Sequence, residues 1–380
     1  MGAIACRGSE SGDVHTEDGK GLSVGKVVLV TGVARHLGSR FVQTIRRQPG
    51  VDLVVGVDVQ PSAHDLTGSP DTADLAEYTF VRADIRRPTV ARVIAEHAVD
   101  TVVHLNVSTT MLGSTSRSTV KETNVIGTMQ LLAAVQKAPS VQRLVVKSTT
   151  SVYGSAPRDP AVFQERMQPK TLPSGGFAKD AVEVEGYVRG FARRRPDVAV
   201  CVLRFANIVG PHADTPLNEY FSLPVLPTVL GYDPRLQFVH EDDAVEVLRL
   251  ASVDPRRGTT NSGTFNVAGD GVLLLSQAAR RLGRPTVPML LPAVSWIAGL
   301  ARQTRVLDFS PEQMRLLTHG RVVDTTHLRE TFGYTPRYST EAALADLGRS
   351  TRAGLLPPAE VARWTSRVAE LLPIGRGDNG

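Results

Sequence analysis

Cysteine is scarce in this sequence of 380 residues. The two cysteines, Cys6 and Cys201, are too few for a disulfide framework and lack the close spacing of a zinc site. The acidic run at residues 241–243 is not accompanied by the further ligands of a metal motif, so we predict no metal site. Little cysteine is typical of proteins in a reducing compartment, and the sequence therefore predicts a cytoplasmic location.

Long apolar runs are also lacking. The longest apolar stretch, residues 286–301, is too short and too interrupted by proline to span a bilayer. Residues 1–25 are rich in Gly, Ser and Asp, which predicts a disordered tail and not a signal peptide. We therefore expect a protein without an integral membrane segment.

Lysine is scarce as well, and the basic residues are not clustered. The chain carries 43 basic and 38 acidic residues, for a net charge of +5, and only seven of the basic residues are lysines. Proteins that bind nucleic acid gather their basic residues on one face, so we expect no nucleic-acid partner. Hydrophobic residues make up 42% of the chain, which is typical of an ordinary globular protein with a large core.

What the sequence does contain is a series of short apolar runs separated by helical patterns. The first run, residues 26–32, is rich in β-branched residues and is followed by a helical pattern from about residue 36 to 47. Strands that alternate with helices predict an α/β fold with a doubly wound, parallel, Rossmann-type sheet. The other predicted strands are residues 52–58, 78–85, 100–107, 141–149, 197–205 and 263–269, and the other predicted helices are residues 118–138 and 178–195.

The composition changes after residue 205, where proline-rich connections and short elements begin. This change predicts a smaller C-terminal α+β domain that holds the substrate. We assign residues 26–205 and about 237–270 to the Rossmann domain, and residues 206–236 and 271–345 to the substrate domain. Residues 346–380 are expected to form a helical segment and a tail.

The segment TGVARHLG, residues 31–38, follows the first strand and opens a helix. Gly32 would allow the tight turn and Gly38 the close contact between helix and strand. The start of the helix, at Arg35, His36 and Leu37, would then face the pyrophosphate of a dinucleotide.

The end of the second strand supplies a carboxylate. Asp58 comes 20 residues after Gly38, where an acidic residue accepts hydrogen bonds from the adenosine ribose. A carboxylate repels a 2′-phosphate, so the sequence predicts NAD and not NADP. Arg35 replaces the glycine that this motif usually has between Gly32 and Gly38. Its guanidinium could pair with the phosphate, or Arg35 could be a solvated residue on a loop that binds the cofactor less tightly.

Several ordered motifs make the chain similar to the extended short-chain dehydrogenase/reductase superfamily, in its NAD-dependent epimerase/dehydratase branch. The resemblance covers roughly residues 26–345. Besides TGVARHLG, the motifs are ADI (83–85), VVHLNVS (102–108), NVIGTMQLL (124–132), STTSVYG (148–154), LRFANIVGP (203–211), QFVHEDDAV (237–245), GTFNVAGDG (263–271) and VVDTTHLRETFGYTP (322–336).

The resemblance implies NAD as cofactor and a nucleotide-linked sugar, such as a UDP-sugar, as substrate. It places two residues of ADI beside the adenine, three residues of VVHLNVS along the cofactor, and an asparagine that supports the active-site backbone. It also implies a homodimer formed through the helices at 118–138 and 178–195. The implied cofactor residues are Asp84, Ile85, Leu105, Asn106, Val107 and Asn124, and the implied substrate residues are Asn207 and Arg235.

One feature of the family is missing. The family carries a Tyr-x-x-x-Lys pair on the helix after the fifth strand, and Phe177 and Ala181 occupy these two positions, with Glu185 fixing the register. None of the seven lysines has a tyrosine four residues before it. The loss of a general base typically costs about 10²- to 10⁴-fold in rate.

The remaining candidates for catalysis lie around the fifth strand. Thr149 matches the catalytic Ser/Thr of the family, Lys147 shares its sheet face and could replace the missing cation, and Tyr153 could carry a proton. Two functions stay open: an epimerase-like oxidoreductase or isomerase with non-standard catalytic residues, and an inactive NAD-binding regulator or scaffold.

Overall fold

The computed structural model describes residues 25–63, 66, 75–107, 117–169, 173, 176–256, 258–290 and 311–351. The predicted N-terminal tail, apart from Gly25, and the predicted C-terminal segment after residue 351 lie outside the described residues. No helix in the described ranges has the length and apolar character needed to cross a membrane.

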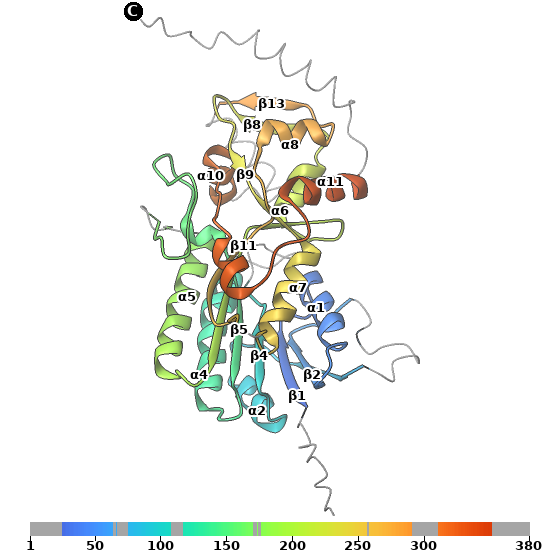
Figure 1. Ribbon diagram of the computed structural model, residues 1–380, viewed down its shortest axis with the longest axis vertical. Helices are drawn as coiled ribbons and strands as arrows, with labels where there is room; N and C mark the ends of the chain where they lie inside the picture. The colour runs from blue at the N-terminus through green and yellow to red at the C-terminus, as the bar shows by residue number, and fades with distance from the viewer. Residues whose placement is uncertain are drawn as a thin grey trace, which may run out of the picture.

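A parallel sheet of seven strands forms the centre of the molecule (Figure 1). Its order is β3-β2-β1-β4-β5-β6-β11, and every neighbouring pair is parallel, which confirms the predicted doubly wound α/β fold. The order reverses direction between β1 and β4, so the β1 and β4 ends mark the switch point of the sheet. The strands are β1 (Lys26–Thr31), β2 (Val51–Asp58), β3 (Glu77–Arg82), β4 (Thr101–His104), β5 (Arg143–Thr149), β6 (Ala199–Phe205) and β11 (Gly263–Val267).

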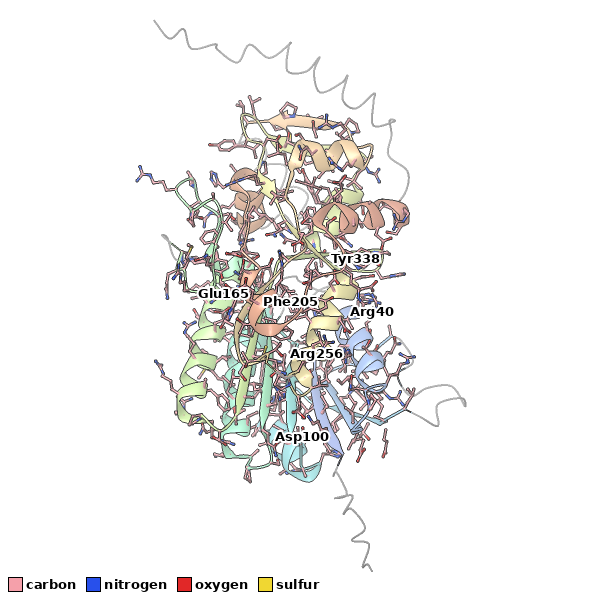
Figure 2. All side chains as sticks on the ribbon, in the orientation of Figure 1. Arg40, Asp100, Glu165, Phe205, Arg256 and Tyr338 are labelled. Carbon is pink, nitrogen blue, oxygen red and sulfur yellow. The ribbon has the colours of Figure 1, made fainter. Side chains whose placement is uncertain are left out.

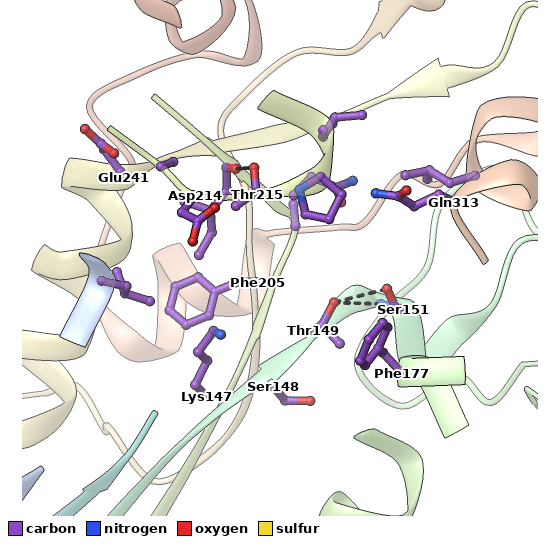
Figure 3. A pocket seen from close by; sticks show the side chains of 18 of the residues that line it. Lys147, Ser148, Thr149, Ser151, Phe177, Phe205, Asp214, Thr215, Glu241 and Gln313 are labelled. Atoms are coloured by element: carbon purple, nitrogen blue, oxygen red, sulfur yellow. Dashed lines mark hydrogen bonds between the residues drawn. The ribbon is translucent and has the colours of Figure 1, made fainter. Parts of the chain in front are cut away.

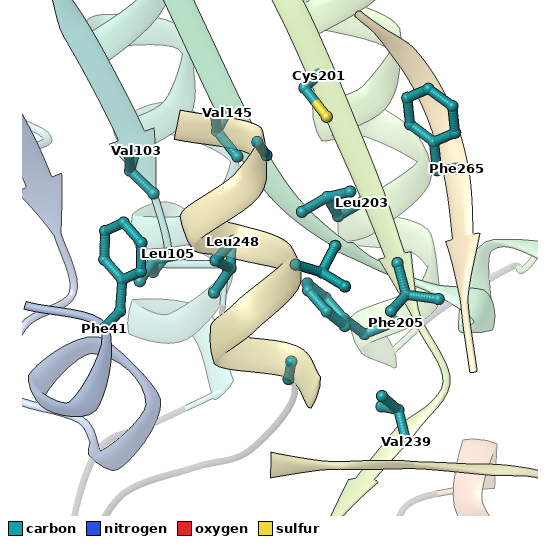
Figure 4. Packing of buried hydrophobic residues seen from close by; sticks show 14 of the residues in the cluster. Phe41, Val103, Leu105, Val145, Cys201, Leu203, Phe205, Val239, Leu248 and Phe265 are labelled. Carbon is teal, nitrogen blue, oxygen red and sulfur yellow. The ribbon is translucent and has the colours of Figure 1, made fainter. Parts of the chain in front are cut away.

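Helices cover both faces of this sheet because each helix has one apolar side. On one face, α1 buries Phe41 and Ile45, and α7 packs Leu248 against the strands (Figure 4). On the other face, Leu131 and Val188 belong to a second apolar cluster. The helices of the first face are α1 (His36–Ile45) and α7 (Glu241–Ser252), and those of the second are α2 (Thr89–Glu96), α4 (Thr128–Lys137) and α5 (Gly176–Arg194).

The helix predicted at residues 118–138 is not one regular helix. It consists of α3 (Arg117–Glu122), a π-helical turn (Thr123–Gly127) and α4. Ile85 packs against this turn so closely that a Cβ on Gly127 would be 2.6 Å from its Cδ1, so the contact requires glycine at this position. The π turn places the buried Asn124 opposite Asp180 of α5, with its amide donating at 3.2 Å.

A smaller part lies above the carboxyl ends of the strands (Figure 1). It has its own apolar cluster, which includes Phe221, Leu273 and Leu344. Phe205, at the end of β6, lies at the junction between this part and the sheet (Figure 2). Its elements are β7 (Asn207–Val209), α6 (Pro216–Ser222), β8 (Leu226–Val229), β9 (Arg235–Leu236), β10 (Phe238–His240), β12 (Leu273–Leu274), α8 (Leu275–Arg281), β13 (Thr286–Met289), α10 (Pro311–His319) and α11 (Thr340–Ser350). A further π turn (Leu328–Phe332) packs on β11 and belongs to the apolar cluster of the sheet.

A buried polar cluster ties α5 to the sheet. The guanidinium of Arg204 donates from Nε and Nη2 to the two oxygens of Glu185, at 2.9 and 2.6 Å. Ser148 donates to the same carboxylate at 2.6 Å, and Arg204 also donates to the hydroxyl of Tyr153 at 2.7 Å. Tyr153 in turn donates to Asn266 of β11 at 2.8 Å. The cluster therefore satisfies a buried charge pair with hydrogen bonds from three strands.

Candidate functional site

A cavity of about 140 Å³ opens where the strand ends meet the smaller part (Figure 3). The start of α1, the end of β5, the start of α5 and the start of α10 all contribute to its wall. Six of the residues named from the sequence line it, namely Arg35, His36, Leu37, Lys147, Thr149 and Asn207, and so does Phe177. Segments that lie far apart in the sequence thus meet at the edge where open α/β sheets bind ligands.

The loop between β1 and α1 has the shape of a phosphate-binding turn. Gly32 has a φ of +82°, which favours glycine, and a Cβ there would lie 3.0 Å from the backbone nitrogen of Asn106. A Cβ on Gly38 would lie 2.1 Å from the carbonyl oxygen of Gly32. Arg35 occupies the N-cap of α1, and its side chain makes no capping hydrogen bond to the first turn. The backbone N–H groups in the first turn of α1 therefore receive no hydrogen bond acceptor from the N-cap side chain. The positive end of the helix dipole lies at the carboxyl edge of the sheet.

Arg35 adds a cation to this turn. Burial lowers the pKa of Arg35, and the carboxylates of Asp214 and Asp58 act in the opposite direction. The guanidinium lines the same cavity as Lys147. Two cations beside a helix start suit the phosphates of a dinucleotide, so the loop fits this group even though a glycine is replaced.

Asp58 ends β2 next to the same loop. Its Oδ2 accepts from the backbone nitrogen of Ala34 at 3.0 Å, and its Oδ1 accepts from that of Val59 at 2.7 Å. Burial raises the pKa of Asp58, while these backbone donors and the charge of Arg35 oppose the shift. The carboxylate is thus held in place beside the turn by backbone donors, and its four lone pairs exceed the three backbone donors that act on it.

The other residues named for the cofactor come from the segments that follow β4 and β3 and from the π turn before α4. The backbone at Leu105, Asn106 and Val107 follows β4 and passes beside Gly32, while the Leu105 and Val107 side chains are buried. Asp84 receives three hydrogen bonds from the guanidinium of its neighbour Arg86, whose side-chain bond lowers the pKa of Asp84. The buried Ile85 packs against the π turn that holds Asn124. None of these side chains lines the cavity described above.

Lys147 and Thr149 both come from the end of β5 and both line the cavity, as their spacing predicts (Figure 3). The amine of Lys147 donates to the carbonyl oxygen of Val107 at 3.0 Å. Burial, and then the charge of Arg35, lower the pKa of Lys147 to about 8. The Thr149 hydroxyl accepts from the backbone nitrogen of Ser151 and donates to its Oγ, both at 3.2 Å.

Tyr153 has a different position from the one expected of a proton carrier. Strand alternation ends at Thr149, and a 3₁₀ turn (Thr150–Tyr153) points Tyr153 into the buried cluster with Arg204 and Asn266. The side chain is 1% exposed, and burial raises the pKa of its phenol. Tyr153 does not line the cavity, so its phenol does not reach the part of the cavity wall that the structure describes.

Phe177 lies on the cavity wall, with its ring beside Thr149 and Ser151 in Figure 3. The guanidinium carbon of Arg117 is 4.5 Å from the centre of this ring. Ala181, one turn further along α5, is 1% exposed and belongs to the apolar core. Neither side chain can carry a proton or a charge.

The two residues named for substrate lie in different cavities. Asn207 lines the cavity with Lys147 and Thr149. Arg235, the exposed residue of strand β9, lines a second cavity together with Asp159 and His319. The sequence could not predict this separation, because it depends on the fold of the smaller part.

Four charged residues of the cavity wall were not assigned to the site from the sequence: Asp214, Glu241, Glu312 and Arg321. Burial raises the pKa of the Glu312 carboxyl, and the charge of Arg321 and the backbone nitrogens of Phe177 and Ala178 oppose the shift. Burial lowers the pKa of Arg321 to about 10. The acidic run at residues 241–243 is visible in the sequence, but no local pattern places any of these residues at the cavity, since each comes from the smaller part or its border and reaches the site only through tertiary packing.

Comparison with known proteins gives a consistent result. Residues 28–268, more than half of the chain, match the model of the NAD dependent epimerase/dehydratase family. An uncharacterized protein of Mycobacterium tuberculosis is 43% identical over 349 residues, which cover 91% of this chain and 90% of the relative. A UDP-glucose 4-epimerase of Erwinia amylovora is 26% identical over 199 residues, covering 50% of this chain and 56% of the enzyme.

Among solved structures, the fold resembles UDP-glucuronic acid 4-epimerase from Bacillus cereus in complex with UDP-glucuronic acid and NAD. The TM-score is 0.63 at 18% identity, and the match covers 85% of this chain and 98% of that chain. At this identity the likeness concerns the fold.

Proposed function

Because the chain belongs to the NAD dependent epimerase/dehydratase family, we propose that it binds NAD and acts on a nucleotide-linked sugar. The proposed activity is that of a UDP-sugar 4-epimerase-like oxidoreductase or isomerase with non-standard catalytic residues. The observation that supports it best is the cavity at the strand ends, where the cations of Arg35 and Lys147 meet Thr149 and Asn207. Groups that can bind phosphate and groups that can bind a sugar hydroxyl thus line the same cavity.

Each residue has a defined task in this proposal. The α1 start and Arg35 would hold the pyrophosphate of NAD, and Asp58 would bind the adenosine ribose. Asn207 would contact the diphosphate of the nucleotide sugar. Arg235 lines the neighbouring cavity and would reach that diphosphate only from there, so its assignment has less support than that of Asn207.

The chemistry at the sugar depends on the end of β5. Bound NAD supplies a hydride acceptor to a site of this kind. Thr149 would hydrogen-bond the reacting hydroxyl of the sugar, and the ammonium of Lys147 would stabilise negative charge on that oxygen. Lys147 is thereby assigned the role of the missing cation, while Phe177 shields the site from water.

A specific observation supports the second candidate, an inactive NAD-binding regulator or scaffold. The cavity wall carries Phe177 where the family has its proton-transferring tyrosine, and Ala181 is buried among apolar residues. Such a protein would bind NAD and turn over no sugar.

The test is to incubate the purified protein with NAD and with UDP-, GDP- and dTDP-sugars, and to follow NADH absorbance and sugar products by chromatography. We expect conversion of at least one UDP-sugar. Binding of NAD in calorimetry without conversion of any sugar supports the regulator instead, and absence of both contradicts both candidates.

Substituting Asp58 by asparagine is expected to weaken NAD binding by about 10- to 100-fold, because hydrogen bonds to a charged group contribute about 1.5–3 kcal/mol. The preference for NAD over NADP should fall at the same time. Calorimetric titration with both dinucleotides measures this. Asp52→Asn, at the other end of β2, is the matched control and should leave the Kd unchanged. Equal affinity of Asp58→Asn and the wild type would exclude the ribose contact.

The pH dependence of turnover tests the role of Lys147. Its pKa of about 8 means that the ammonium form is lost as pH rises through this value. If the cation is required, the rate falls above about pH 8, and Lys147→Arg moves this limb to higher pH. A rate that rises through pH 8 would show that the neutral amine acts as a base instead.

A homodimer is part of the proposal. Met129 of α4 and Tyr187 of α5 are exposed large apolar side chains on the two helices named for the interface, and Ile126 of the π turn is exposed beside them in the sequence. Sedimentation equilibrium of the wild type and of Met129→Lys measures whether this face pairs two copies.

A further inference from the structure

Two histidines and a glutamate meet at the border between the sheet and the smaller part. His36 is the first residue of α1, Glu241 is the first residue of α7, and His212 lies between β7 and α6. The Nε2 atom of His36 is 3.3 Å from Oε2 of Glu241, and Nδ1 of His212 is 3.3 Å from Oε1. One ligand atom from each residue lies within 4.8 Å of the others. The fold thus gathers three metal-binding side chains from three separate segments.

These separations are close to the geometry of a zinc site. Zn²⁺ binds imidazole nitrogens and carboxylate oxygens at about 2.0–2.2 Å in a tetrahedral arrangement, so its ligand atoms lie about 3.3–3.5 Å apart. The two imidazoles approach different oxygens of the Glu241 carboxylate, each at 3.3 Å, and one ligand atom from each of the three residues lies within 4.8 Å of the others. Small side-chain rotations would bring these atoms to the separations of a bound ion. The imidazole rings are stacked with their centres 5.7 Å apart.

The carboxylate is the second observation that points to a ligand. Glu241 is 2% exposed, and its Oε2 accepts no hydrogen bond from the described residues. Its neighbour is Nε2 of His36, 3.3 Å away but outside hydrogen-bond geometry, and a cation bound between the two atoms would satisfy the buried oxygen.

Arg40 lies behind the carboxylate. Its Nη1 is 3.2 Å from Oε1 of Glu241, and its Nη2 donates to Asp242 at 2.6 Å. The guanidinium therefore fixes the orientation of Glu241, as the outer partners of metal ligands do, and Asp242 balances its charge.

We propose that His36, His212 and Glu241 bind a divalent transition-metal ion, for which Zn²⁺ is the best match. Two imidazoles and one carboxylate suit Zn²⁺, whereas Mg²⁺ and Ca²⁺ prefer oxygen ligands alone. The side chain of His212 is 72% exposed, so the ion can enter from solvent and keep a water as fourth ligand. His36 and Glu241 also line the main cavity, and the ion would form part of its wall.

The experiment uses the full chain, free of tag and treated with a chelator. Calorimetric titration with ZnCl₂ near pH 7.5, together with elemental analysis after gel filtration, should give one ion per chain. His212→Ala and Glu241→Gln should weaken the Kd by at least about 100-fold, more than the loss of an outer partner causes. His97→Ala, which removes a histidine at the end of α2 near the opposite edge of the sheet, is the matched control and should bind as the wild type does.

Cobalt provides a readout that a folding defect cannot imitate. Co²⁺ bound to the wild type should give the intense visible absorption of a four-coordinate ion, and His212→Ala should lose it while its circular dichroism stays unchanged. Zinc that binds the wild type and His212→Ala equally is an adventitious ion only, and it overturns the proposal, as does the absence of stoichiometric binding. Neither measurement needs NAD or a sugar, so the result is independent of the proposed function.

Discussion

Arg204→Met is expected to lower the free energy of unfolding by about 3–5 kcal/mol, because it leaves a buried charge without its partner. The carboxylate of Glu185 is 4% exposed and receives two of its hydrogen bonds from Arg204. Methionine has a similar length but no donor. The Tyr153 hydroxyl would lose a donor in the same substitution. The loss should therefore exceed that of an ordinary core substitution.

Urea denaturation followed by circular dichroism measures the change. Arg189→Met is a matched control, since Arg189 lies 3.5 Å from the same carboxylate with its side chain 60% exposed. Such exposed pairs contribute about 0–1 kcal/mol. The double variant Glu185→Gln/Arg204→Met should be more stable than Arg204→Met alone, because no unpaired charge remains. Equal losses for Arg204→Met and Arg189→Met would show that the buried pair contributes nothing special.

Phe177→Tyr combined with Ala181→Lys is expected to raise the turnover of a nucleotide sugar by about 10²- to 10⁴-fold, the typical contribution of a general base. The phenol would enter the cavity beside Thr149, because the ring of Phe177 already lies on its wall. Arg117, 4.5 Å from the ring centre, would favour the phenolate. The added ammonium would lie on the same face of α5, one turn later.

The measurement is the initial rate with a UDP-sugar and NAD, for the double variant and for each single variant. Phe177→Leu changes the same ring without adding a hydroxyl and should give no gain. Thr149→Val in the double variant should remove the gain, since Thr149 binds the reacting hydroxyl in this proposal. Lysine at the buried position 181 costs stability, so thermal melting accompanies the assay. A folded double variant that binds NAD and shows no gain would contradict a retained substrate site.

The sheet could be predicted from the sequence because buried parallel strands carry a local signal. Continuous β-branched runs predicted all seven strands, and β1 begins at Lys26 as expected. The π turn in the helix at 118–138 could not be predicted, since the residue that crowds Gly127 comes from a distant loop. Helical periodicity contains no information about such a contact.

The candidate site likewise has features that the sequence could predict and features that it could not. Lys147 and Thr149 line one cavity together with Ser148 between them, and strand alternation says nothing beyond Thr149, where a 3₁₀ turn sends Tyr153 into the buried polar cluster. His212 comes close to Glu241 because β7 and β10 pair in parallel. This pairing places the loop after β7, which carries His212, beside the start of α7, which carries Glu241. Only the tertiary structure contains that information.

The position of β11 has a consequence for synthesis. This strand closes the sheet beside β6, yet the chain first builds α6, β8, β9 and α7 before β11 is made. A nascent chain on the ribosome therefore exposes β6 as an open edge until residue 267 has been translated. Unpaired strand edges bind other extended chains. The interval between these two strands is therefore the stage at which the β6 edge is open to pairing with other extended segments.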